Sequence, residues 1–400
     1  MNPPVAHSER RAGPAQGVTL ILIAVLPIMA IAALVADLPQ LLVVFHAVPE
    51  HELWVPMILT LPSLCVALFA SIAGVIADRW GRRRLLLAAL VLFALLGPLP
   101  LLFHSLPAVL ASRFVVGIAE ACILTSCNAL WGDYFDDDLR RKWLSLQQTS
   151  GPVFTALLAV AGGALAAIGW AEPFWLYGSG LLICIPAARY LWEPAPSAGR
   201  DDRIARSSTP FPRARALRIA GVTFAVSIVF FVLAIQQGRM FAALGVGSPA
   251  RSGELIMLTS IGALAGAVSF GLLRRRSIGE LLALGLFAYG LGFVGISASH
   301  GAGSGAIFGT IAQFGSSIVL PALIAWTLGS FEAEHRGRGV GIWGAVFFTG
   351  QFLSAPILTL LERWRGGLLP ALGILGSVTL LAALAGAWLT RHRARLSNAG

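Results

Sequence analysis

Three charged side chains, Asp37, Arg113 and Glu120, lie inside long apolar stretches of the sequence. A charge at the centre of a lipid bilayer costs about 2.5–3.5 kcal/mol on insertion scales, and such residues often mark an ion or substrate pathway. A carboxylate whose surroundings change can take up a proton on one side and release it on the other. Glu120 and Asp37 are therefore candidates for proton coupling, and Arg113 is a candidate for substrate binding.

The spacing of Arg113 and Glu120 puts them on one face of a helix. They are seven residues apart, nearly two helical turns, and so about 10 Å apart along the axis. Gly117 lies between them, and Asn128, a further candidate for substrate binding, lies further along the same face. Such a face must line a cavity or contact another helix. We expect Asp37 to pair with Arg113, and Glu120 to lie deeper, near the membrane midplane.

Each of these residues also has a structural interpretation. Arg113 and Glu120 could hold their helix to its neighbours, and Asp37 could lie at the membrane surface if the first helix ends early. Later apolar stretches contain further residues that could line a substrate cavity, with packing or lipid contact as the alternative: Gln236, Gln237, Arg239, Gln313, Phe347 and Phe348.

The composition indicates which elements position these side chains. Of the 400 residues, 57% are hydrophobic and only 12% are charged, against about 25% charged in a soluble domain. This excludes a soluble enzyme, a nucleic-acid-binding domain and a disordered protein. Membrane helices need roughly 20 apolar residues each. Twelve apolar runs are present, at about 17–43, 54–77, 84–104, 107–131, 146–168, 173–192, 216–240, 252–273, 278–297, 303–328, 339–361 and 367–390.

The charges of the loops predict an orientation. With the N-terminus in the cytoplasm, all but five of the 29 basic residues fall on the cytoplasmic side, as the positive-inside rule requires. We expect six helices in residues 1–192, a cytoplasmic linker over 193–215, and six helices with a short tail in 216–400. Both termini would be cytoplasmic, in a multi-pass protein of the bacterial inner membrane.

The loop between the second and third runs carries a motif: Gly74-x-x-x-Asp78-Arg79-x-Gly81-Arg82-Arg83-Arg84. It resembles the loop 2–3 signature of the major facilitator superfamily. Two further stretches resemble motifs of that family, Arg113-x-x-x-Gly117 and Arg336-Gly337-Arg338-Gly339. The resemblance implies an all-α fold of twelve transmembrane helices, in two six-helix bundles related by a pseudo-twofold axis, with a substrate cavity between them.

The loop 2–3 motif is expected to act as a conformational latch formed by Gly74, Asp78, Arg79, Gly81, Arg82 and Arg83. Its glycines permit close helix approach and a tight turn, and Asp78 can pair with an arginine or face a helix N-terminus. The resemblance implies a latch between the halves that favours the outward-facing state. The alternative for the arginines is simple anchoring of the topology.

Two resemblances bear on the substrate. Gly151-Pro152 is similar to the fifth helix of drug/proton antiporters, although Thr155 and Ala156 stand where that motif has two glycines. The family resemblance thus favours a secondary active transporter that exports amphipathic or drug-like molecules in exchange for protons. The stretch 117–121 resembles helix four of spinster-type lipid transporters. The alternative is therefore transport of an organic anion or a lysophospholipid-like amphiphile, with Arg113 as anion clamp.

Missing motifs limit the other classes of function. The only lysine, Lys142, is not in a phosphate-binding loop, and the sequence has no zinc-protease or serine-hydrolase motif. We expect no enzyme activity, no metal site and no cofactor, with a proton gradient as the energy source. A sensor or an embedded enzyme without transport remains the alternative of another class. Expected partners are the small-molecule or lipid-like substrate and membrane lipids, not nucleic acid, and the chain is expected to be a monomer.

Overall fold

The computed structural model describes residues 12–194, 210–273 and 275–397, and these residues form helices without any strand. The predicted all-α membrane fold is confirmed. Eleven helices within the described ranges are long and apolar enough to cross a membrane. Residues 195–209, which make up most of the predicted linker, lie outside the described residues.

The N-terminal half contains the first group of helices. They are α1 (Pro14–Val35), α2 (Leu38–Val44), α3 (His51–Trp54), α4 (Met57–Trp80), α5 (Arg82–Leu96), the 3-10 helix η1 (Leu99–Leu101), α6 (Leu106–Tyr134), α7 (Asp137–Ala166), the 3-10 helix η2 (Glu172–Gly178) and α8 (Ser179–Tyr190).

The C-terminal half contains six long helices. They are α10 (Arg213–Ala243), α11 (Pro249–Leu272), α12 (Ile278–Ser297), α13 (Ala302–Ser330), α14 (Ala333–Arg365) and α15 (Leu368–Ser397). Several of them begin before the apolar runs because polar turns at the two ends of the bundle continue the helix.

Two predicted helices are interrupted. The first run, 17–43, breaks at Ala36 and Asp37 into α1 and α2. Pro39 has no backbone N–H to donate to the carbonyl oxygen of Val35, and its ring clashes with that carbonyl, so a continuous helix is disfavoured there. The sixth run, 173–192, is a 3-10 helix followed by the 12-residue helix α8. This element is therefore not among the eleven candidate spans, although it occupies the place of the expected sixth helix.

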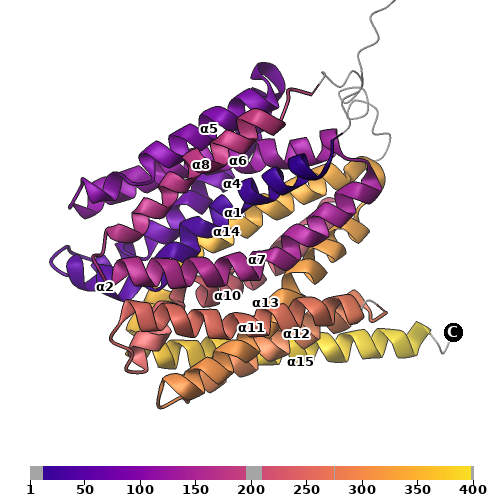
Figure 1. The fold of residues 1–400 in the computed structure, drawn as a ribbon. Helices are drawn as coiled ribbons and strands as arrows, with labels where there is room; N and C mark the ends of the chain where they lie inside the picture. Colours follow the sequence, from indigo (N-terminus) through magenta and orange to yellow (C-terminus); the bar gives the residue numbers. More distant parts are fainter. Residues whose placement is uncertain (1–11, 195–209, 274, 398–400) are drawn as a thin grey trace, which may run out of the picture.

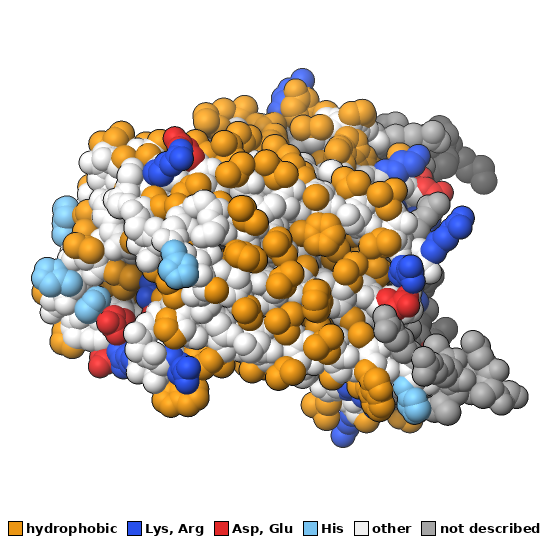
Figure 2. Space-filling view, turned by 90° about the horizontal axis from the view of Figure 1, so that it is seen from below, with side chains coloured by type: hydrophobic (Ala, Val, Ile, Leu, Met, Phe, Trp, Pro, Cys, Tyr) orange, Lys and Arg blue, Asp and Glu red, His pale blue; other side chains and the backbone are white. Residues whose placement is uncertain are grey.

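The helices run side by side across Figure 1, so the molecule has two ends. One end, on the right, contains the end of α8, the start of α10, the end of α15 and the turn between α4 and α5; we call it the linker end. The far end, on the left, contains α2 and α3. Figure 2 shows apolar side chains over the middle of one face, with charged side chains mostly toward the two ends. This distribution is typical of a protein that spans a bilayer.

Packing follows the two halves. In the N-terminal half α4 packs on α6 and α1 packs on α7, and in the C-terminal half α10 packs on α14 and α11 packs on α13. The halves meet where α7 contacts α11, α4 contacts α14 and α1 contacts α10. The largest apolar cluster includes residues of both halves, among them Leu34, Phe231 and Phe347.

Candidate functional site

Helix α6 places Arg113 in the interior of the N-terminal half, where the side chain is fully buried. Its Nη2 donates to the carbonyl oxygen of Gly97 at 2.6 Å, and its Nε donates to Oγ of Ser112 at 3.2 Å. The guanidinium also stacks on two rings, with its Cζ 4.8 Å from the centroid of Phe174 and 4.7 Å from that of Tyr177. Nη1 has no partner among the described residues.

Glu120 lies two turns further along α6 and is 4% exposed. Its Oε1 atom has no hydrogen-bond partner in the described part of the chain. Gly117, between Glu120 and Arg113, allows α4 to come close, because a Cβ atom placed there would lie only 2.6 Å from Cα of Pro62. The predicted face of α6 therefore contacts another helix, α4, at this depth.

Asp37 is also buried, at the break between α1 and α2, with 0% exposure. Neither of its carboxylate oxygens has a hydrogen-bond partner among the described residues. The predicted pairing of Asp37 with Arg113 is wrong for this structure, because Arg113 points instead at the end of α5 and at the rings of η2. The first helix does end early, at Val35, yet Asp37 is not at a solvated surface.

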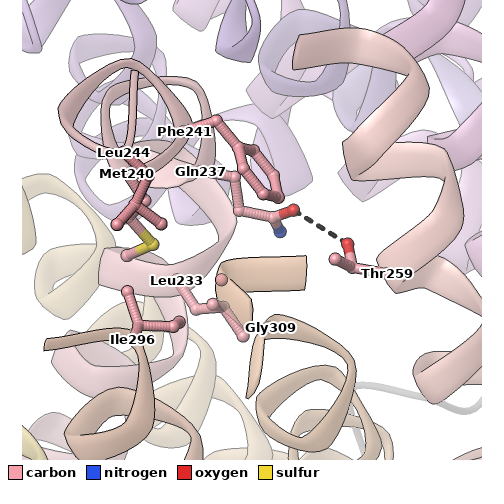
Figure 3. Close-up of a pocket in the computed structure, with 9 residues that line it drawn as sticks. Leu233, Gln237, Met240, Phe241, Leu244, Thr259, Ile296 and Gly309 are labelled. Carbon is pink, nitrogen blue, oxygen red and sulfur yellow. Dashed lines mark hydrogen bonds between the residues drawn. The ribbon is translucent and has the colours of Figure 1, made fainter. Parts of the chain in front are cut away.

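Gln237 lines a small cavity inside the C-terminal half, drawn in Figure 3. Its Oε1 accepts from Oγ1 of Thr259 at 3.2 Å, which joins α10 to α11. The cavity has a volume of about 10 Å³, about enough for one water molecule. Apart from these two residues the lining is apolar or glycine: Leu233, Met240, Phe241, Leu244, Ile296, Gly305 and Gly309.

The other polar candidates lie apart from this cavity. Gln236 is buried, and its Oε1 accepts from Nη1 of Arg239 at 3.2 Å. Gln313 accepts from the hydroxyl of Ser316 on its own helix. Asn128 is exposed on the part of α6 nearer the linker end. Neither the glutamines nor Asn128 hydrogen-bonds to Arg113 or Glu120.

Phe347 belongs to a cluster of aromatic rings midway along α10 and α14. Its ring is stacked on that of Trp343, with centroids 5.0 Å apart and planes 15° apart. It also meets Phe231 at 5.0 Å, Phe230 at 5.9 Å and Phe348 at 6.0 Å. The indole N–H of Trp343 is buried without a partner among the described residues.

The predicted latch residues form a junction at the linker end. Arg82 pairs with Asp78 at 3.0 Å and with Asp133 at the end of α6. The carboxylate of Glu193 accepts from the backbone N–H of Arg82 at 2.6 Å, which caps the start of α5. Gly81 precedes α5 with φ +108°, and a Cβ atom there would lie 2.7 Å from the Glu193 carboxylate. Only glycine fits this turn without strain.

The remaining latch residues act in the same half. Arg83 donates to the carbonyl oxygens of Leu191 and Ala188, both at 2.8 Å, at the end of α8. Arg79 is exposed, and the nearest atom to a Cβ placed on Gly74 is a methyl group of Thr125 at an ordinary 3.7 Å. In this structure the junction therefore ties α4, α5, α6 and α8 together.

Several residues of these sites were not predicted. Tyr177 and Phe174 stack on Arg113 from a segment far away in the sequence, and no spacing connects them. Trp343 is on the same helical face as Phe347, four residues away, which is a usable signal. Glu193 follows the sixth apolar run directly, so an acid near the arginines of the motif could have been expected from the topology.

Comparison with known proteins gives the family. The profile of the Major Facilitator Superfamily matches residues 19–309. The chain belongs to this superfamily. It is thus a multi-pass membrane transporter of small molecules rather than an enzyme. No group of three or more His, Cys, Asp or Glu side chains that could hold a metal ion occurs in the described ranges.

Two curated relatives are similar over most of their length. The 3-(3-hydroxy-phenyl)propionate transporter of Escherichia coli is 26% identical over 336 residues, which cover 79% of this chain and 77% of the relative. The class C tetracycline resistance protein of Escherichia coli is 28% identical over 357 residues, which cover 83% of this chain and 87% of the relative.

Solved structures agree with the fold. A POT family peptide transporter, described as auto-inhibited, has a TM-score of 0.73 at 16% identity and covers 94% of this chain and 97% of its own. A D-xylose–proton symporter has a TM-score of 0.70 at 17% identity and covers 92% of this chain and 96% of its own. Both similarities support the helical fold described above, and neither identifies the substrate.

Proposed function

We propose that this protein is a proton-coupled exporter of small amphipathic or drug-like molecules that works by alternating access in the bacterial inner membrane. The observation that carries the proposal is the pair of buried carboxylates, Glu120 and Asp37, with unpaired oxygen atoms. Burying an ionised carboxylate without a partner costs several kcal/mol. Each group therefore binds a proton while it is buried and can release it when water reaches it.

The aromatic cluster supports the proposed substrate class. Phe347 and Trp343 belong to a cluster of rings midway along the helices, and rings of this kind pack well against planar apolar groups. One curated relative transports 3-(3-hydroxy-phenyl)propionate, which contains a phenyl ring, and the other confers resistance to tetracycline. We assign the apolar part of the substrate to these rings, and its polar contacts to Asn128, Gln236, Gln237 and Gln313.

A second candidate is transport of an organic anion or a lysophospholipid-like amphiphile, with Arg113 as the clamp. The unpaired Nη1 of Arg113 favours it, since that atom can still donate to an anion. The name of the first curated relative, a phenylpropionate transporter, also agrees with an anionic substrate. In this structure the rest of the guanidinium is occupied by Gly97, Ser112 and two rings, which makes the exporter the better supported reading.

We also propose an energy source, an oligomeric state, an orientation and a latch for this protein. The proton gradient supplies the energy without a cofactor, and the protein acts as a monomer surrounded by lipids with both termini in the cytoplasm. The junction formed by Asp78, Arg79, Arg82 and Arg83 with Gly74 and Gly81 lies within one half here. We propose that it engages the other half, as a latch, in the outward-facing state.

A cell assay tests the exporter proposal. Cells that express the protein are loaded with labelled lipophilic cations, organic anions and lysolipids, and accumulation is measured with and without a protonophore. We expect expression to lower the accumulation of lipophilic amphiphiles severalfold, and the protonophore or Glu120→Gln to abolish the difference. A change confined to organic anions would favour the second candidate. Equal accumulation in expressing and control cells for every compound would contradict both.

A further inference from the structure

The two halves are joined by polar contacts at the far end. Arg363, in the last turn of α14, pairs with Glu50 at 2.5 Å and lies 3.7 Å from the carboxylate of Glu52. The hydroxyl of Thr359, one turn earlier, donates to the carbonyl oxygen of Glu52 at 3.2 Å. Both acids belong to the segment between α2 and α4, so these contacts tie the C-terminal half to the N-terminal half.

Glycines bring the backbones of the two halves together at the same end. A Cβ atom placed on Gly238 of α10 would lie 2.0 Å from the carbonyl oxygen of Val35, at the end of α1. A Cβ on Gly253 of α11 would lie 2.5 Å from the carbonyl oxygen of Ala159. Such backbone contact between helices excludes water and substrate from the far end.

A partly buried ion pair connects these two kinds of contact. Arg239 donates to both carboxylate oxygens of Glu362, at 3.0 and 2.7 Å. The two side chains are only 15% and 13% exposed, and this two-pronged geometry fixes both partners. Arg239 directly follows Gly238, and Glu362 directly precedes Arg363. The pair therefore links Gly238, which touches the end of α1, to Arg363, which contacts Glu50 and Glu52.

The tight contact between α7 and the C-terminal half lies at the far end. The buried residues of α7, which faces the other half through α11, are confined to its last turns at the far end: Ala159, Gly162, Gly163 and Ala166. No residue of 137–158 in the same helix is buried. The junction around Arg82 stays within its own half. The halves are thus in backbone contact at the far end, whereas α7 is half-buried or exposed from residue 137 to residue 158.

We propose that Arg239 and Glu362 are positioning residues for a lock that holds the far end closed, in which Arg363 bridges to Glu50 and Glu52. The inference rests on the proposed alternating access, since a transporter must open this end in another state. The lock opens when Arg363 leaves the two glutamates and α10 moves away from the end of α1. Because Arg239 and Glu362 connect α10 to α14, the two movements occur together.

Distance measurements between spin labels test the lock without substrate or a gradient. The four native cysteines are replaced, and labels are placed at Ala47 and Gly247, which are exposed at the far end on opposite halves. We expect Arg363→Ala to raise the fraction of long distances about two- to fivefold, the range that an exposed ion pair supports. Glu362→Gln should act in the same direction, because Arg363 then loses its fixed position.

Arg251→Ala is the matched control. It removes an ion pair at the same end, Arg251 with Glu254 at 2.6 Å, that stays within one half. It should leave the distances unchanged. The exchange of charges in Glu50→Arg, Glu52→Arg and Arg363→Glu together should restore the short distance.

Unchanged distances in both Arg363→Ala and Glu362→Gln would overturn the lock. An equal shift in Arg251→Ala would also overturn it, because any lost charge would then suffice. Neither result bears on proton coupling, since no transport is measured. Conversely, a shifted distance in a protein that exports nothing would leave the lock standing and the proposed function contradicted.

Discussion

At the scale of single residues, the buried charges of the N-terminal half separate into two kinds. Arg113 is held by a carbonyl group, a hydroxyl group and two aromatic rings, so two of its three nitrogen atoms have hydrogen-bond partners. Glu120 and Asp37 have oxygen atoms without partners among the described residues. A satisfied cation stabilises the fold, whereas an unsatisfied carboxyl group is free to exchange a proton. Under the proposed function, Arg113 therefore stabilises the N-terminal half while the two acids exchange protons.

Arg113→Lys tests this distinction. A lysine cannot reproduce the planar stacking on Phe174 and Tyr177 together with the bond to Gly97. We expect a loss of about 1–3 kcal/mol of stability, measured as a lower midpoint of thermal unfolding in detergent. Arg365→Lys, at an exposed arginine that stacks on Trp364, should leave the midpoint unchanged. If Arg113→Lys keeps its stability and loses only the transport of anions, Arg113 is an anion clamp.

At the scale of helices, glycines decide which pairs can approach closely. Gly117 brings α6 against the backbone of α4 and so sets the place of Glu120, one turn away. Gly74, in the family motif, has no such neighbour in this structure. The sequence contains both glycines but does not tell which of them touches a neighbouring helix. That depends on the distance between the two helices, which only the structure gives.

Substitutions at these two glycines should therefore differ. Gly117→Ala forces α4 and α6 apart and should cost about 1–3 kcal/mol, as overpacking does. Gly74→Ala meets only a methyl group at an ordinary distance and should cost less than that. Thermal unfolding of the two variants measures the difference. A loss of stability in Gly74→Ala equal to that in Gly117→Ala would contradict the packing described here.

At the scale of the whole molecule, the apolar runs of the sequence predict the fold because only helices and closed barrels can satisfy the backbone hydrogen bonds within a bilayer. Long apolar runs must be helices, and the order of the runs gives the order of the helices along the chain. The candidate site was predicted less completely. The types of Asp37, Arg113 and Glu120 and their burial could be predicted from the sequence, but their partners could not. The rings around Arg113, the cap formed by Glu193 and the pair of Arg239 with Glu362 all depend on contacts between segments distant in the chain.

We propose that substrate movement is coupled to protons through Glu120. The most direct measurement uses proteoliposomes that contain a pH-sensitive dye, with a proton gradient imposed and an amphipathic substrate added. We predict substrate-dependent proton movement in the wild type and its loss in Glu120→Gln, in which a group of the same shape cannot release a proton. Substrate movement without protons, with Glu120→Gln equal to the wild type, would contradict the account and make Glu120 a structural residue.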